Sequence, residues 1–161
     1  MKAILCKAWG GPETLVLEDI PSREPGDGEV KIRVRAAGVN FPDVLIIQKK
    51  YQIQPPLPFS PGAEVAGDVI SVGAGVSHLK AGDKVVSFCG VGGFAEEVIA
   101  PAAVTMPMPL GVPYALAAIF SLAYGTSWHA VRDRAALLAG ETMLVLGASG
   151  GVGLADRKSV V

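Results

Sequence analysis

Four glycines near the end of the chain are spaced for binding a dinucleotide phosphate. Gly147, Gly150, Gly151 and Gly153 follow the apolar run TMLVLG, where a nucleotide-binding βα unit carries its phosphate loop. Glycine permits a tight turn, lets the backbone approach a pyrophosphate and lets the next helix pack closely. A turn without a ligand is the alternative, because the spacing is A-x-x-G-G-x-G rather than G-x-G-x-x-G. The predicted cofactor-binding residues of this turn are Gly147, Ala148, Ser149, Gly150, Gly151, Val152 and Gly153.

The segments that must position this turn change character along the chain. Up to residue 105, runs such as EVKIRVRAAGV and DKVVSFCG alternate in polarity or are rich in Val, which predicts strands of a small barrel or sandwich. One short helix is expected at FPDVLIIQKKY, because Pro42 occupies a first-turn position that needs no N–H. The Ala-rich segment 113–140 predicts two helices separated at Gly125, and a strand is expected over 141–147. The predicted fold class is therefore mainly β with an α/β C-terminal part.

The composition limits the kinds of partner. A formal net charge of -1 and a pI near 6.1 leave no basic footprint for nucleic acid or for an anionic membrane. The longest apolar stretch, VPYALAAIFSLAYG, contains Pro113 and is shorter than the ~20 residues of a spanning helix, and the N-terminus lacks a signal-peptide pattern. Cys6 and Cys89 are far apart and are expected to be unpaired thiols. We therefore expect a globular, cytoplasmic protein with small-molecule partners, no nucleic acid and no membrane.

Four stretches, taken together, resemble one enzyme family. They are AAGVNFPDVL, YQIQPPLPFSPGAEVAGDVISVGAGVSHLKAGDKV, GGFAEEVIAP and AGETMLVLGASGGVG, in the order and spacing of the zinc-independent quinone oxidoreductases of the medium-chain dehydrogenase/reductase superfamily. The resemblance implies a GroES-like barrel domain with the substrate cleft over residues 1–112, followed by the start of an NADPH-binding Rossmann domain over 113–155. It ends there, so we expect residues 156–161 to be a tail without a family counterpart and the chain to be truncated.

Zinc-dependent relatives in this superfamily differ at two positions. They carry a cysteine where this chain has Asn40 and a histidine where it has Ala63, directly before Glu64. Catalytic zinc sites use three protein ligands from Cys, His or carboxylate, and neither soft ligand is present here. We therefore expect no metal, and we interpret Glu64 as a strand-end carboxylate that is hydrogen-bonded to backbone. The missing ligands also disfavour a zinc alcohol dehydrogenase.

The resemblance implies roles for three further side chains. Asn40 is the expected catalytic donor that faces the nicotinamide and the substrate, Tyr51 the pocket wall or oxygen donor, and Thr126 a residue beside the nicotinamide. A quinone or enone is already electron-poor, so hydrogen-bond donors can replace zinc during hydride transfer. Structural alternatives stay open for each residue: Asn40 can cap the helix that follows, Tyr51 can pack against the prolines after it, and Thr126 can cap a helix start.

Two functions follow from these expectations. The first is an NADPH-dependent oxidoreductase that acts on a quinone or enone and forms a homodimer, and we expect this chain alone to be weak or inactive. The second is a non-catalytic, truncated GroES-like module that self-associates. The residue that selects NAD or NADP stands ~20 residues beyond the glycine turn, past the end of the chain, so NADPH is implied by the resemblance alone.

Overall fold

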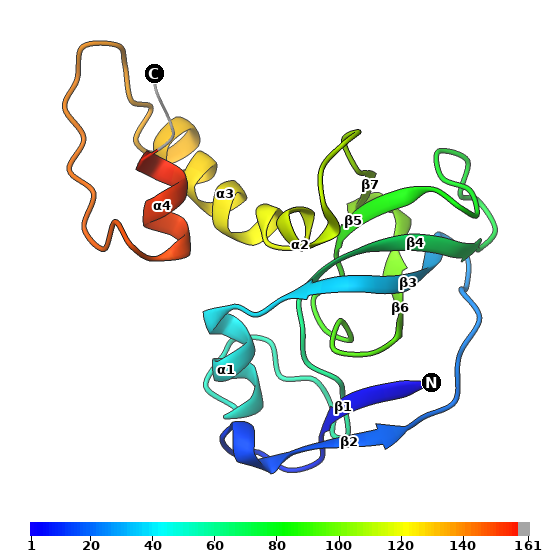
Figure 1. Ribbon diagram of the computed structural model, residues 1–161. Helices are drawn as coiled ribbons and strands as arrows, with labels where there is room; N and C mark the ends of the chain where they lie inside the picture. Colours follow the sequence, from blue (N-terminus) through cyan, green and yellow to red (C-terminus); the bar gives the residue numbers. More distant parts are fainter. Residues whose placement is uncertain (158–161) are drawn as a thin grey trace. The chain divides into compact units, whose positions relative to one another are not determined.

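Strands arranged in two sheets are the main regular elements of the N-terminal part of the chain (Figure 1). The computed structural model describes residues 1–157, so residues 158–161 of the expected tail 156–161 lie outside the described residues. The predominance of strands confirms the mainly β fold class. The strands are β1 Lys2–Cys6, β2 Leu15–Asp19, β3 Glu29–Gly38, β4 Glu64–Val72, β5 Lys84–Phe88, β6 Glu97–Pro101 and β7 Thr105–Pro107.

The larger sheet is antiparallel and has the strand order β6-β3-β4-β5-β7, so β4 lies at its centre. The smaller sheet pairs β1 with β2. Two isolated bridges, Ala3 with Ala95 and Cys6 with Phe59, connect β1 to the loops that flank the larger sheet. These bridges pair backbone groups on the edge of β1 that does not face β2.

The central strand is buried on both faces where it begins. Val65 belongs to a core cluster with Val30, Ile32 and Val85, whereas the next residue, Ala66, packs on the opposite face. Successive side chains of a strand point to opposite faces, so two separate layers must cover β4. On the second face the cover is α2, whose Ala117 and Ala118 pack against Ala66 and Val86.

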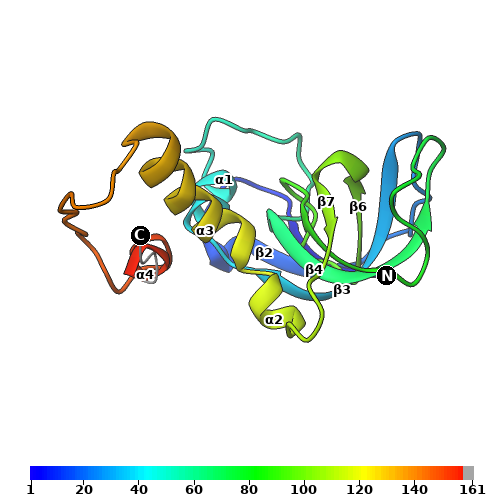
Figure 2. The ribbon, with the colours of Figure 1, turned by 90° about the horizontal axis from the view of Figure 1, so that it is seen from above.

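Short helices follow the strands, as Figure 2 shows from above. The helix expected at FPDVLIIQKKY is confirmed by α1, with Pro42 in its first turn. The expected break at Gly125 is wrong, because Gly125 lies inside α3; an exposed glycine costs a helix only about 1 kcal/mol. The helices are α1 Phe41–Ile47, α2 Tyr114–Ala117, α3 Phe120–Trp128, the π-helical η3 His129–Arg134 and α4 Gly151–Arg157, with 3-10 turns η1 Pro12–Thr14 and η2 Ala102–Val104.

The chain divides into two compact units, Met1–Ile119 and Phe120–Val161. The first holds both sheets, α1 and α2, and the second holds α3, η3 and α4. The strand expected over 141–147 is wrong: this segment is extended and then turns, without strand pairing. A strand exists only by hydrogen bonding to a neighbour, and the described residues of the second unit supply none. The expected division at residues 112 and 113 stays a prediction.

A polar network fastens α2 to the larger sheet. The Tyr114 hydroxyl donates to one carboxylate oxygen of Asp68, and the Arg35 Nε donates to the other at 2.7 Å. The hydrogen bond from Tyr114, together with the Arg35 guanidinium, holds the pKa of Asp68 below its ordinary value, although burial opposes this. A carboxyl whose pKa is lowered by folding stabilises the folded state above its unfolded pKa and loses that contribution as the pH falls through its folded pKa.

Replacing Tyr114 by Phe should therefore lower the free energy of unfolding by about 1 kcal/mol at pH 7, because a hydrogen bond to a charged group is lost. The difference from wild type should begin to shrink below about pH 4, the ordinary aspartate range, and should disappear as the pH falls through the lower pKa of Asp68 in the folded protein. Urea unfolding of both proteins at pH 7 and below pH 4 measures the difference in the free energy of unfolding. Tyr124→Phe, in the second unit, is the control and should change neither value; an equal effect of both variants would contradict the prediction.

Candidate functional site

Asn40 lies in the turn between β3 and α1, where it begins the helix. Its backbone N–H donates to Asp43 Oδ2 at 2.8 Å, and the Asp43 N–H donates back to the Asn40 carbonyl oxygen at 3.0 Å. This reciprocal pairing satisfies amides that a helix start leaves unpaired. The structural alternative for Asn40, a helix cap, is thus correct: Asn40 is the N-cap of α1, and its side chain takes part in the capping box with Asp43.

The amide NH₂ of the Asn40 side chain has a further partner, on strand β4. Its Nδ2 donates to Glu64 Oε1 at 2.9 Å. Glu64 is the first residue of β4 and stands opposite Gly38 of β3 in the sheet register. The interpretation of Glu64 as a strand-end carboxylate hydrogen-bonded to backbone did not foresee this partner, which its position in the register brings to it.

Two buried carboxyl groups therefore converge on Asn40. Asp43 is 4% exposed and Glu64 is 1% exposed. Burial raises the pKa of Asp43, and the backbone amides of Asn40, Gly62 and Ala63 that face its carboxylate partly offset this rise. Sequence reasoning missed the role of Asp43, although its place three residues after Asn40 is the spacing of a capping box.

Cys89 lies beside this pair of carboxyl groups. It follows β5, and its Sγ lies 3.4 Å from the carbonyl oxygen of Ala63. Burial, with a further contribution from the negative charges of Asp43 and Glu64, raises the pKa of Cys89 to about 12. The thiol is therefore neutral at physiological pH and is a poor nucleophile.

Tyr51 lies beyond the other end of α1. Its ring packs against the cluster of Cys6, Ile46, Ile47 and Phe59. Within the described residues, the Tyr51 hydroxyl has no hydrogen-bond partner, so it is available as a donor. The seven-residue helix α1, about 10 Å long, lies between Asn40 and Tyr51 in the chain. Asn40 is thus joined to Asp43 and Glu64 but not to Tyr51.

The surface on either side of Asn40 is apolar. Val39 and Phe41 are 75% and 73% exposed, although both are large hydrophobic residues. Exposed apolar side chains that adjoin a polar group are typical of binding surfaces. We call Val39, Asn40 and Phe41 the Asn40 rim.

The remaining predicted residues belong to the second unit. Thr126 is exposed and is the seventh residue of α3, so the alternative that it caps a helix start is wrong. Its neighbour Ser127 is buried and donates to the carbonyl oxygen of Val152 at 2.7 Å. Sequence reasoning missed Ser127, which fastens α3 to the first turn of α4.

The predicted glycine turn is present before α4. Gly147 has a φ of 76°, and the Gly150 N–H donates to its carbonyl oxygen at 3.0 Å. A Cβ on Gly153 would lie 2.4 Å from that same oxygen, so only glycine lets α4 pack this closely on the turn. Residues 147 and 149–152 are exposed, which leaves backbone of the turn accessible to a ligand.

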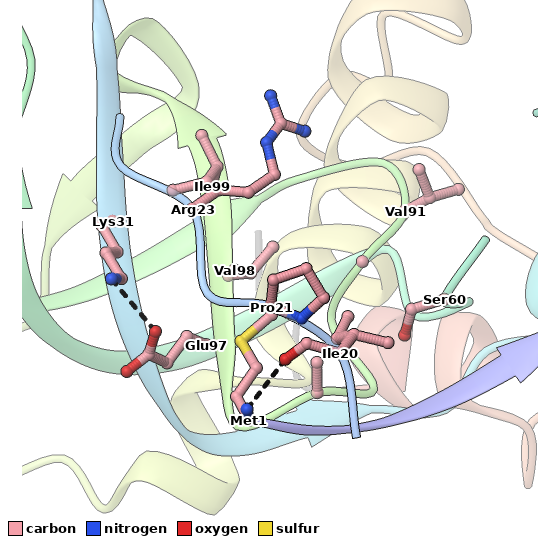
Figure 3. Close-up of a pocket in the computed structure, with 12 residues that line it drawn as sticks. Met1, Ile20, Pro21, Arg23, Lys31, Ser60, Val91, Glu97, Val98 and Ile99 are labelled. Carbon is pink, nitrogen blue, oxygen red and sulfur yellow. Dashed lines mark hydrogen bonds and ion pairs between the residues drawn. The ribbon is translucent and has the colours of Figure 1, made fainter. Parts of the chain in front are cut away.

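Figure 3 shows a pocket of about 250 Å³ that contains none of the predicted site residues. Its charged lining residues are Arg23, Lys31 and Glu97. The Lys31 ammonium is surrounded by Ser22, Glu24 and Glu97 at 2.7, 3.2 and 3.2 Å. An ammonium has three N–H donors, and these three acceptors occupy them.

Residues 1–157 contain neither a cluster of metal-binding side chains nor a helix that could span a membrane. Asn40 and Ala63 supply no zinc-binding side chain, and no group of three or more His, Cys, Asp or Glu in this part of the chain is arranged to hold a metal ion. Within the same residues, every helix is too short or too polar to span a bilayer.

The high pKa of Cys89 predicts slow alkylation. At pH 8, iodoacetamide should react with native Cys89 about a thousandfold more slowly than with an ordinary thiol, because the thiolate is the reacting form. Peptide mass spectrometry after timed quenching measures the rate. The chain in urea is the control and should react at the ordinary rate at both Cys6 and Cys89. Native Cys89 that reacts as fast as the unfolded chain would refute the assignment.

Comparison with known proteins agrees with this geometry. The family "Alcohol dehydrogenase GroES-like domain" matches residues 26–110. Quinone oxidoreductase of Rattus norvegicus is 42% identical over 157 residues, covering 96% of this chain and 48% of that protein. Quinone oxidoreductase-like protein 2 homolog of Nematostella vectensis is 40% identical over 157 residues, covering 96% of this chain and 42% of that protein.

Solved structures agree as well. The quinone oxidoreductase of Thermus thermophilus, also solved in complex with NADPH, matches with a TM-score of 0.84 and 37% identity, covering 96% of this chain and 48% of that one. This chain spans about half the length of the relatives it matches. It belongs to the alcohol dehydrogenase GroES-like domain family, as a quinone oxidoreductase-like protein of the medium-chain dehydrogenase/reductase superfamily.

Proposed function

We propose that this chain supplies the substrate barrel and the first part of the nucleotide-binding domain of an oxidoreductase that transfers hydride from NADPH to a quinone or enone without zinc. The observation that carries the proposal is the amide of Asn40, which is held by Glu64 on an exposed apolar rim. Zinc relatives have a metal ligand at this position, so a hydrogen-bonding amide replaces a metal-binding thiolate.

The chemistry of the Asn40 rim suits an electron-poor, planar substrate. When bound, NADPH supplies the hydride, and the protein must hold and polarise the acceptor. Val39 and Phe41 offer apolar surface for a ring. One N–H of the Asn40 amide is used by Glu64, so the second N–H can donate to a substrate oxygen, and the Tyr51 hydroxyl is a further donor.

The glycine turn supports the cofactor assignment. Its exposed backbone and absence of side chains at Gly147, Gly150 and Gly151 fit the approach of a pyrophosphate. The Thermus thermophilus relative was solved with NADPH, which supports a nicotinamide cofactor. We assign contacts with it to Asn40, Thr126 and residues 147–153.

We place the reaction in the cytoplasm. Cys6 and Cys89 are both free thiols. Unpaired cysteines are typical of proteins that work in a reducing compartment.

The proposal predicts activity in a chain of family length. Residues 1–155 joined to the remaining half of the Rattus norvegicus enzyme should reduce quinones with NADPH, also in the presence of a chelator. Asn40→Ala should lower kcat about 10- to 100-fold, the size of a lost transition-state hydrogen bond, with the NADPH Kd within about twofold. Gln52→Ala, an exposed amide, is the control. In a fluorescence titration, the 161-residue chain alone should bind NADPH at least about tenfold more weakly than the joined, family-length chain does.

The opposite results would contradict the proposal. Loss of turnover on chelation would indicate a metal enzyme. Full turnover of Asn40→Ala would remove Asn40 from the reaction. Micromolar NADPH binding by the printed chain would mean that residues 1–161 already hold the main contacts of the cofactor.

We also propose that the chain forms a homodimer through its second unit. Leu144 and Leu146 are 81% and 85% exposed in the segment before the glycine turn. Neighbouring exposed leucines are typical of an association surface, most simply one related to itself by a two-fold axis.

Sedimentation velocity tests this association. A double variant, Leu144→Gln with Leu146→Gln, should shift the chain toward monomer at concentrations where wild type dimerises, because the apolar surface is lost. Leu110→Gln is the matched control, since Leu110 is also exposed but lies in the first unit. A wild-type chain that stays monomeric at high concentration would contradict the proposal.

A further inference from the structure

We propose that Glu64 is a positioning residue that holds the amide of Asn40 in a single orientation toward the substrate. This inference rests on the proposed function, because that function assigns the substrate contact to Asn40. Beyond that function, we infer that the buried carboxylate of Glu64 sets the direction in which the Asn40 amide presents its N–H donors.

An ionised carboxylate only accepts hydrogen bonds, whereas the two ends of an amide differ. Glu64 Oε1 lies 2.9 Å from Asn40 Nδ2, so the NH₂ end of the amide must face Glu64. The second N–H is then left for another partner, while the amide oxygen faces the backbone N–H of Asp43 in the capping box of α1. Without Glu64, the NH₂ end of this half-exposed amide would lose its carboxylate partner, and only the capping contact would orient the side chain.

The carboxylate of Glu64 is itself held in place. It begins the central strand β4, between β3 and β5, where it pairs with Gly38 on one side and Phe88 on the other. A Cβ on Gly38 would lie 2.7 Å from Glu64 Oε1 and 2.5 Å from the Ala118 carbonyl oxygen. Only glycine opposite Glu64 therefore leaves room for the carboxylate beside Asn40.

The second buried carboxyl group has a separate task. Asp43 accepts from the backbone N–H of Asn40, at 2.8 Å, and so fixes the start of α1. Glu64 accepts from the side chain. The main chain and the side chain of Asn40 are thus held by different carboxylates, which makes Asp43 a matched control for Glu64.

NMR of the 161-residue chain tests the contact directly. In wild type, the two Nδ2 protons of Asn40 should be widely separated in chemical shift, because only one is bonded to a carboxylate. Glu64→Asp, which withdraws the carboxylate by one methylene, and Glu64→Gln, which removes its charge, should each reduce that separation. Asp43→Asn should shift the backbone amide of Asn40 and leave the Nδ2 pair unchanged. Either Glu64 variant alone suffices if the other does not fold.

The kcat of the family-length chain, residues 1–155 joined to the remaining half of the Rattus norvegicus enzyme, tests whether the orientation of the Asn40 amide matters for the reaction. Glu64→Gln should lower kcat about tenfold and leave the NADPH Kd within about twofold, whereas a general loss of structure would weaken both. Unchanged Nδ2 resonances in the folded Glu64 variants would overturn the proposal, and so would altered resonances with unchanged turnover. Full turnover of Asn40→Ala would instead refute the proposed function, while the Nδ2 resonances still report whether Glu64 holds the amide.

Discussion

A carboxylate that is removed from water must be hydrogen-bonded, and in this chain the requirement acts most strongly at Glu64, on the central strand of the larger sheet. Its bond to Asn40 ties the turn after β3 to the start of β4, although 24 positions separate the two residues. The turn in turn begins α1, whose far end leads to Tyr51. The position of the Asn40 rim relative to β4 thus depends on one partly buried polar contact.

The polar groups of the barrel are mostly committed to one another. Lys31 is surrounded by three acceptors, and Asp68 accepts from both Tyr114 and Arg35. The Asn40 amide and the Tyr51 hydroxyl differ, because each retains a donor. A neutral donor polarises an oxygen less than a zinc ion does. An amide at this position therefore suits substrates that are electron-poor before they bind.

Local sequence patterns predicted the helices and strands better than they predicted the contacts between them. Alternation and β-branched residues identified the strands of the barrel, and Pro42 identified the start of α1, since both signals act within a few residues. The same local reasoning predicted a strand over 141–147, which failed because pairing needs a neighbour. It also missed the contact of Glu64 with Asn40, because only the register of β3 and β4 brings the two together. The glycine turn was predictable, but the tie from Ser127 to Val152 was not.

The hydrogen bond between Ser127 and Val152 affects when the glycine turn can form during synthesis of the chain. Ser127 and Val152 lie 25 residues apart, and their hydrogen bond joins α3 to α4 beside the glycine turn. Parallel strands of a nucleotide-binding sheet pair only after a long crossover has been synthesised, whereas helix packing over a short separation closes a small loop at low entropic cost. A ribosome that has released residue 157 has already supplied every group of this contact. The glycine turn can therefore take shape during translation as soon as α3 and α4 are both available.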